Sequence, residues 1–350
     1  MKVKITALPL VYLTFSALLL TSYGQNNTSG LYLVRQNGKW GYIDKAGNLV
    51  IKPQFDNAED FAEGLAAIRL GRKSGYIDKT GKIIIRPMFD VASEFSKGMA
   101  GVVINGRVGF INKIGKFVIR PQFEWRGFSG FGDEGLAMIS ISGKYGYIDT
   151  TGRIIIKPLY SMTRSWSEEL LPVVIGDKWF YINRAGEIAI KPAFDDAGPF
   201  SEGLAAAEIG SKWGYIDKAG DIIISPQFNR ALGFSEGLAA VELGGKWGYI
   251  NRQGKIVIDL QFDNAWDFIN GLAPVVLEAV HQYVDPERTG IVHVGNRWAY
   301  IDKTGKEILK VDALIDRVGD FNNGLARVEF KDKRIGYIDK SGKYIWEPTR

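Results

Sequence analysis

Residues Gly203 to Gly237 have the sequence GLAAAEIGSKWGYIDKAGDIIISPQFNRALGFSEG, and the same pattern starts again at Leu238. The aromatic residue before Ile-Asp or Ile-Asn marks each copy, and successive copies are 34, 34, 37, 34, 34, 34, 51 and 37 residues apart. A period this regular indicates a repeat protein. The nine marker residues are Tyr42, Tyr76, Phe110, Tyr147, Tyr181, Tyr215, Tyr249, Tyr300 and Tyr337.

A period of 34 residues is also that of helical tetratricopeptide repeats, so the period alone does not distinguish helices from strands. The amino-acid composition of the repeat does. Each copy has several glycines and short β-branched or aromatic runs, which favours strands joined by turns. We expect strand A over 204–209, strand B over 213–217 and strand C over 221–225. Asp217 to Gly220 has the signature of a type I turn, and we expect the glycine to adopt a left-handed conformation. This glycine recurs as Gly47, Gly81, Gly115, Gly152, Gly186, Gly220, Gly254, Gly305 and Gly342.

Strand C ends at a proline in seven repeats, where pairing with a further strand would stop. Its three consecutive apolar residues, such as Ile222 to Ile224, favour a strand that is covered on both faces. Nine three-stranded repeats are too many for one twisted sheet, so each must pack on the next. We predict an all-β fold of stacked repeats in an open, curved or superhelical array. A closed β-propeller is the alternative.

Residues 1–24 have the features of a signal peptide: Lys2 and Lys4, an apolar run over 5–20, and small residues at Ser22 to Gly24. An uncleaved membrane anchor is the alternative. A polar leader follows over 25–30, and the repeats fill 31–350 as a single domain. We therefore expect an exported protein that is periplasmic, on the cell surface or extracellular, with no membrane span after cleavage.

The repeats resemble the bacterial WG repeat, also called the KWG repeat. The resemblance covers about residues 31–348 and rests on KWGYID at 39–44 and 212–217, KWGYIN at 246–251, and Gly-Leu-Ala starts such as 237–239. Several repeats depart from the motif, with Ser74, Val108, Tyr145 or Ile335 in place of Trp and Phe180 or Ala299 in place of Gly. The resemblance implies an all-β bacterial repeat protein, often exported, and no particular activity or ligand.

Repeat 8 departs most from the common frame, because it contains 17 extra residues within 274–296. The pattern predicts a long hairpin with strands over 274–284 and 291–298. Repeat proteins often vary loops on their binding face, so we expect this hairpin to determine specificity, unless it folds flat on its neighbours. The candidate partner-binding residues are His281, Tyr283, Arg288 and His293.

A basic residue precedes the Trp position in all nine repeats. A regular array would turn this column into a line of positive charge suited to an anionic polymer. Acidic residues also recur, however, and interleaved charge favours solubility and protection of strand edges. With a formal net charge of only +5 and expected export, nucleic acid is not the expected partner. The column is Lys39, Lys73, Arg107, Lys144, Lys178, Lys212, Lys246, Arg297 and Arg334.

The chain has no cysteine, which excludes thiolate chemistry and disulfides. The Asp or Asn that ends each strand B is expected to bond the amides of its own turn. The repeated Trp position favours packing over a sugar-binding ladder. We expect no metal and no cofactor. The predicted function is an exported, non-enzymatic repeat scaffold that binds a protein or a cell-envelope polymer. A secreted glycan-active hydrolase, or a carbohydrate- or polyanion-binding module, is the alternative.

Overall fold

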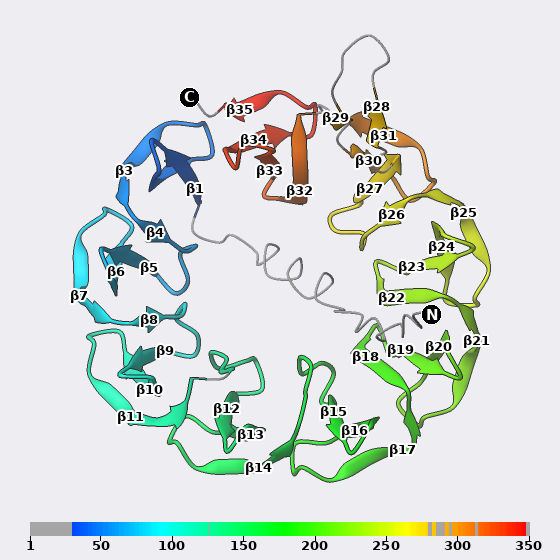
Figure 1. The fold of residues 1–350 in the computed structure, drawn as a ribbon, viewed down its shortest axis with the longest axis horizontal. Helices are drawn as coiled ribbons and strands as arrows, with labels where there is room; N and C mark the ends of the chain where they lie inside the picture. The colour runs from blue at the N-terminus through cyan, green and yellow to red at the C-terminus, as the bar shows by residue number, and fades with distance from the viewer. Residues whose placement is uncertain are drawn as a thin grey trace, which may run out of the picture.

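The computed structural model describes residues 30–347, apart from 126, 279–281, 285–290, 294–295 and 312–313. The expected signal peptide and residues 25–29 lie outside the described residues. The nine repeats form nine small antiparallel blades, which we number 1–9, and the blades follow one another around a ring (Figure 1). Blades 3 and 4 are joined in one seven-stranded sheet by the pair Glu124 and Ser140. The all-β repeat prediction is confirmed. Within the described part of the chain, no helix is long and apolar enough to cross a bilayer.

Strands A, B and C occur in every blade, with strand C on the outer side of the ring (Figure 1). Strand A is β1 (Leu31–Gln36), β5 (Leu65–Leu70), β9 (Met99–Ile104), β12 (Ala137–Ile141), β15 (Leu171–Ile175), β19 (Leu204–Ile209), β23 (Leu238–Leu243), β27 (Ala273–Glu278) and β33 (Leu325–Phe330). Strand B is β2 (Lys39–Asp44), β6 (Lys73–Asp78), β10 (Arg107–Asn112), β13 (Lys144–Ile148), β16 (Lys178–Ile182), β20 (Lys212–Ile216), β24 (Lys246–Asn251), β30 (Arg297–Ile301) and β34 (Ile335–Asp339). Strand C is β3 (Leu49–Phe55), β7 (Ile83–Phe89), β11 (Phe117–Glu124), β14 (Ile154–Tyr160), β17 (Ile188–Phe194), β21 (Ile222–Phe228), β25 (Ile256–Phe262), β31 (Glu307–Lys310) and β35 (Tyr344–Trp346).

Six blades have a fourth strand that the sequence pattern did not predict. It precedes strand A, pairs with it and lies on the inner side of the ring (Figure 1). In blades 6, 7 and 9 this inner strand is interrupted by a register shift, for instance between Ala197 and Phe200. The prediction of three strands was therefore incomplete, because a short, irregular strand does not show a clear alternation of apolar and polar residues. The inner strands are β4 (Asn57–Ala58), β8 (Val91–Ala92), β18 (Asp196–Ser201), β22 (Arg230–Ser235), β26 (Asn264–Ala265) and β32 (Ile315–Asn322).

The glycine after the Trp position is required by the close approach of strands B and C. In blade 6, a Cβ atom on Gly214 would lie 2.4 Å from the carbonyl oxygen of Ile224 and 2.8 Å from the nitrogen of Pro226. The register of β20 and β21 shifts on both sides of the pair between Tyr215 and Ile224. Bulges of this kind bend a strand and increase its twist. The Trp-Gly pair thus lets strand C cross closely over strand B.

The turn between strands B and C has the predicted form. Gly47 has a φ of 87° and its amide donates to the carbonyl of Asp44 at 3.1 Å. The Asp44 carboxylate accepts hydrogen bonds from the amides of Ala46 and Asn48 at 2.9 and 2.8 Å. These bonds hold the pKa of Asp44 below its ordinary value, with the side chain and amide of Asn48 as the main cause. The prediction that this Asp or Asn serves its own turn is confirmed.

Strand C is not covered on both faces, as its apolar run had suggested. In blade 6, Ile222 and Ile223 are 53% and 49% exposed, and only Ile224 is buried. The same pattern recurs in β3, β7 and β25. Strand β21 is the last strand of its sheet and lies on the outer side of the ring, so no further strand of the blade covers its outer edge (Figure 1). The apolar run therefore reflects strand propensity more than burial.

The core lies between blades. Each marker aromatic packs on an aromatic of the next blade, as Tyr249 does on Phe268 with ring centroids 4.9 Å apart. The cluster around them joins residues of blade 7, such as Trp247 and Ile258, with residues of blade 8. Trp179, Trp247 and Trp298 are buried in such clusters, while Trp40 and Trp213 are partly buried. The prediction that these indoles serve packing is confirmed for the three buried ones.

The repeats form a curved array, as expected, but the curve closes. Tyr337 of blade 9 packs edge-on against Tyr32 of blade 1, with ring centroids 5.4 Å apart. Val34 and Ile43 of blade 1 share a buried cluster with Leu325 of blade 9. The predicted open ends are therefore corrected to the alternative, a propeller-like ring (Figure 1). The sequence favours the open form because propellers usually close through a blade shared by both chain ends. Here all described strands of blade 1 come from one end and those of blade 9 from the other.

Candidate functional site

The marker tyrosines hold the inner segment of the next blade. The hydroxyl of Tyr249 donates to the carbonyl of Trp266 at 2.7 Å, and that of Tyr42 donates to the carbonyl of Glu59 at 2.6 Å. Burial raises the pKa of these tyrosines far above its ordinary value, so they remain neutral donors. Equivalent bonds to a backbone carbonyl are made by Tyr76, Tyr181, Tyr215 and Tyr300.

A glutamate on the turn before strand A ties its blade to the next on one side of the ring. The carboxylate of Glu236 accepts from the amide of Gly271 at 3.1 Å and lies 2.9 Å from Nζ of Lys303, both in blade 8. Burial works against ionisation of Glu236, but the bonds from Lys303 and Gly271 outweigh it and hold its pKa below the ordinary value. Glu63, Glu168 and Glu202 make the same contacts with their next blades.

The basic column proposed for an anionic polymer lies on the opposite side of the ring, where it is largely paired. Lys39 lies 2.5 Å from Asp56, and Asp56 also accepts from the amide of Gly71 in blade 2 at 2.6 Å. Lysine and acid thus form a second tie between blades. Other pairs in the column are Lys73 with Asp90, Lys178 with Asp195, Lys246 with Asp263, Arg297 with Glu278, and Arg334 with Asp332.

Three members of this column have no ion pair within the described residues. Arg107 makes a long bond of 3.5 Å to the carbonyl of Gln122. Lys144 and Lys212 have no acid in reach because Ser161 and Asn229 replace the aspartate of the other repeats. The structure therefore does not bring the nine cations together as a line of free charge. Whether any of them binds a polymer stays a prediction.

The insertion of repeat 8 contains the predicted hairpin in part. Strands β28 (Gln282–Val284) and β29 (Ile291–His293) pair antiparallel with each other and belong to no blade (Figure 1). Tyr283 lies opposite Val292, and His293 lies opposite Gln282. His281 and Arg288 lie outside the described residues. The first predicted strand is divided between β27 and β28, since β27 ends at Glu278 as strand A of blade 8.

Acidic residues gather on the inner side of four blades. Asp60, Glu94, Asp267 and Asp320 each directly precede the inner aromatic of blades 2, 3, 8 and 9. Burial raises the pKa of Asp267 to about 6, and the charge of Asp320 adds to this effect. Oδ1 of Asp267 is buried without a hydrogen-bond partner. No group of three His, Cys, Asp or Glu residues in the described chain has a geometry that could hold a metal ion.

The repeated unit itself matches a known family. The sequence profile described as WG containing repeat matches residues 40–73, 75–107, 109–145, 145–179, 179–213, 213–247, 247–278 and 298–333. The chain belongs to the WG repeat family. Comparison with curated protein sequences finds no match.

Comparison with solved structures finds proteins whose overall fold is similar to that of this chain. The WG repeat chain is similar to a structure titled "Crystal structure of the eukaryotic initiation factor", with 12% identity and a TM-score of 0.63 over 90% of this chain and 94% of that one. It is also similar to dihydro-heme d1 dehydrogenase NirN in complex with DHE, with 12% identity and a TM-score of 0.50 over 90% of this chain and 72% of that one. At this identity the likeness shows the fold alone.

One surface of the WG repeat ring was missed in the sequence. The residue just before the proline of strand C is exposed, and it is basic in blades 1 to 5. A comparison of this position across the nine repeats would have found it. The column before the Trp position is basic in every repeat, but most of its residues form ion pairs with acidic residues. The five residues are Lys52, Arg86, Arg120, Lys157 and Lys191.

Proposed function

We propose that this WG repeat protein is an exported, non-enzymatic scaffold that binds a partner protein or a cell-envelope polymer. The observation that carries the proposal is the use of the repeated polar side chains. The marker tyrosine, the turn aspartate and the glutamate before strand A all form hydrogen bonds or ion pairs within their blade or with the next one. Most of the basic column does the same. The repeats therefore build a frame, and recognition is left to the features that differ between blades.

The hairpin of blade 8 is the largest such feature. Strands β28 and β29 pair with each other, while β27 continues directly alongside β30 to complete the blade. In blade 7 the same link is only Gly244 and Gly245. A segment that the blade does not need for its own strand order is suited to carry specificity. We assign partner binding to this hairpin, with His281, Tyr283, Arg288 and His293 as candidate contacts.

The absence of catalysis is part of the proposal and rests on how the acids are used. A glycosidase needs two carboxyl groups with different tasks on either side of a bond. The repeated acids here accept hydrogen bonds from turn amides or from the next blade, in the same way from repeat to repeat. Export is supported by the basic start and apolar run of residues 1–24.

The test is a pull-down from the envelope of the source organism with the full-length tagged chain. A variant in which residues 279–296 are replaced by Gly-Gly, as in blade 7, serves as the comparison. We expect the full chain to recover one partner reproducibly and the variant to lose it while its melting temperature is unchanged. Hydrolysis of a polysaccharide or ester that a single carboxylate substitution abolishes would overturn the proposal.

A further inference from the structure

The five cations before the strand C prolines form a continuous feature, which we call the basic arc: Lys52, Arg86, Arg120, Lys157 and Lys191. They lie on β3, β7, β11, β14 and β17, the outermost strands of five consecutive blades (Figure 1). Each is exposed, and none of the five side chains forms an ion pair or hydrogen bond with another described residue. The arc differs in this respect from the basic column near the Trp position, where most members are paired.

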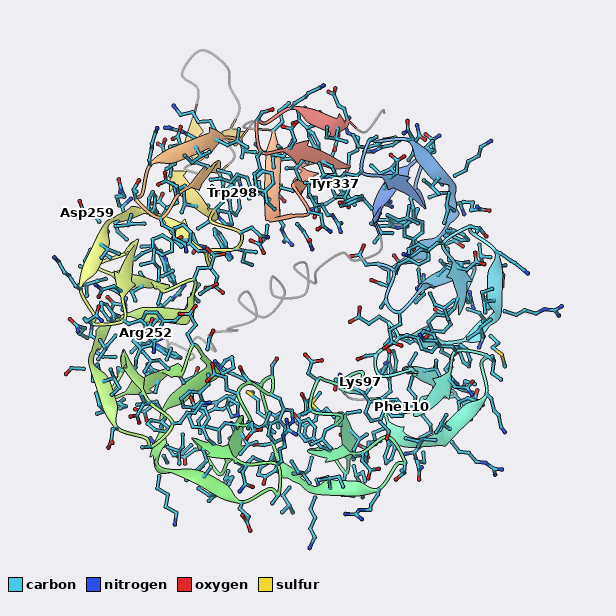
Figure 2. The ribbon with its side chains drawn as sticks, turned by 180° about the vertical axis from the view of Figure 1, so that it is seen from behind. Lys97, Phe110, Arg252, Asp259, Trp298 and Tyr337 are labelled. Atoms are coloured by element: carbon cyan, nitrogen blue, oxygen red, sulfur yellow. The ribbon has the colours of Figure 1, made fainter. Side chains whose placement is uncertain are left out.

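The other four blades lack this feature. Blades 6, 7 and 9 have Ser225, Asp259 and Glu347 at the same position, and Lys310 of blade 8 lies 3.5 Å from Glu307. Figure 2 shows Asp259 on the outer rim. A charge of either sign can protect an exposed strand edge, so edge protection does not explain why the charge is positive in all of blades 1 to 5. Five cations at one equivalent position of five consecutive blades, none of them in an ion pair with a described residue, therefore indicate recognition of an anion.

The middle blade of the arc also has a groove. It is lined by Arg107, Lys116 and Arg120 together with the apolar side chains of Ile104, Phe117 and Pro121. Three cations around an apolar floor suit a ligand that carries anionic groups on a partly apolar body. Exposed aliphatic residues continue this character along the arc, with Val50 45% and Ile84 40% exposed in blades 1 and 2.

The shape of the rim limits the kind of partner. Strands β3, β7, β11, β14 and β17 follow a convex curve (Figure 1), which a flat membrane surface would touch at only one or two blades. A flexible linear polymer can follow the whole curve. An acidic peptide added as an edge strand is disfavoured, because Pro53, Pro87 and Pro121 have no amide hydrogen to offer.

We propose that the basic arc binds a flexible anionic polysaccharide, which runs around the outer rim of blades 1 to 5 and enters the groove of blade 3. This inference rests on the proposed scaffold function and narrows its polymer alternative to one chemistry and one surface. The charged groups of the polymer would pair with the five cations, and its apolar ring faces would contact the aliphatic residues beside them. Affinity is then expected to fall with rising salt concentration.

The test measures binding of the full chain to sodium alginate, a linear polymer of carboxylate sugars, with neutral dextran as the negative control. The arc variant carries Lys52→Gln, Arg86→Gln, Arg120→Gln, Lys157→Gln and Lys191→Gln. The matched variant removes the same charge elsewhere with Lys255→Gln, Lys306→Gln, Arg317→Gln, Lys331→Gln and Lys343→Gln. We expect the arc variant to bind about 30-fold more weakly and the matched variant to stay within about threefold.

A gain-of-function variant completes the test. Ser225→Lys with Asp259→Lys extends the arc into blades 6 and 7 and should strengthen alginate binding by about threefold or more. Equal losses in the arc and matched variants, no binding of alginate, or tighter binding of polyglutamate or anionic vesicles would each overturn the inference. If alginate fails while the hairpin-dependent pull-down succeeds, the basic arc is wrong and the scaffold proposal stands. If the arc binds alginate and the protein also hydrolyses it, the non-enzymatic function fails instead.

Discussion

The contacts between neighbouring blades, which we call seams, are made by side chains that recur from repeat to repeat. The outer rim instead has side chains that differ between repeats. At the seams, a side chain that recurs in each repeat meets a partner in the next blade, as Tyr249 meets the carbonyl of Trp266. At the rim, the position before the strand C proline is exposed and changes from Lys52 in blade 1 to Asp259 in blade 7. Regular recurrence in this protein therefore indicates structure, and change between blades indicates where recognition is to be sought.

Substitution of the glycine after the Trp position tests the close approach of strands B and C within a blade. Gly214→Ala would place a Cβ atom 2.4 Å from the carbonyl oxygen of Ile224, so strand C must move. We expect a loss of about 3 kcal/mol in the free energy of unfolding, measured by denaturant titration. Gly233→Ala is the control, since its nearest neighbour would be Cβ of Ser201 at 3.6 Å. Equal effects of the two substitutions would contradict the account of the motif.

Asp267 is an exception at the seams, because it is buried without a partner for Oδ1. Burial raises its pKa to about 6, above about 3.9 for an unfolded chain, so the folded state binds the proton more tightly. The free energy of unfolding should therefore fall as pH rises from about 4 to about 6. Oδ1 is buried but the residue as a whole is only half-buried, so we expect a change of about 1–2 kcal/mol.

Asp267→Asn removes this titration. The variant should match the natural protein at pH 4 and exceed it in stability by about 1–2 kcal/mol at pH 7. Thermal unfolding at both pH values measures the difference. A natural protein that gains stability relative to the variant as pH rises would show that Asp267 is paired when ionised.

Loss of a marker hydroxyl tests the tyrosine bond at a seam. Tyr249→Phe keeps the ring that packs on Phe268 and removes the donor to the carbonyl of Trp266. We expect a loss of about 1 kcal/mol in the free energy of unfolding. Tyr145→Phe should be neutral in the same titration, because the Tyr145 hydroxyl has no hydrogen bond to a described residue.

The glutamate tie is expected to give the smallest effect because it is exposed. Glu236→Gln keeps the shape of the side chain and weakens its bonds to Lys303 and to the amide of Gly271. We expect a loss of about 0.5 kcal/mol at low salt, which shrinks as salt is added. Since the pKa of Glu236 is held below its ordinary value, the difference should also vanish as pH falls through that lowered pKa. A loss independent of salt and pH would indicate a packing effect.

The strands and turns of the repeat could be predicted because their signals are local. Asp217 to Gly220 defines a turn by itself, and the short apolar runs on either side define strands B and C. The inner strand was missed because its pairing is brief and interrupted, as at Asn57 and Ala58 in blade 2. Closure of the ring could not be predicted, because it depends on the angle between each blade and the next. No single residue determines this angle. The ion pair of Lys39 with Asp56 joins strand B to the bend after strand C, 17 residues further along the chain, so no local pattern in the sequence reveals it.

The way in which Tyr337 meets Tyr32 has a consequence for how the molecule folds. Every other seam joins blades that are neighbours along the chain, so each can form by local search once its two blades exist. The contact between blades 9 and 1 must bring together segments about 300 residues apart, with only non-covalent packing to hold them. This junction should form last and open first, so amide hydrogens of β1 and β34 should exchange with solvent before those of the blades between them.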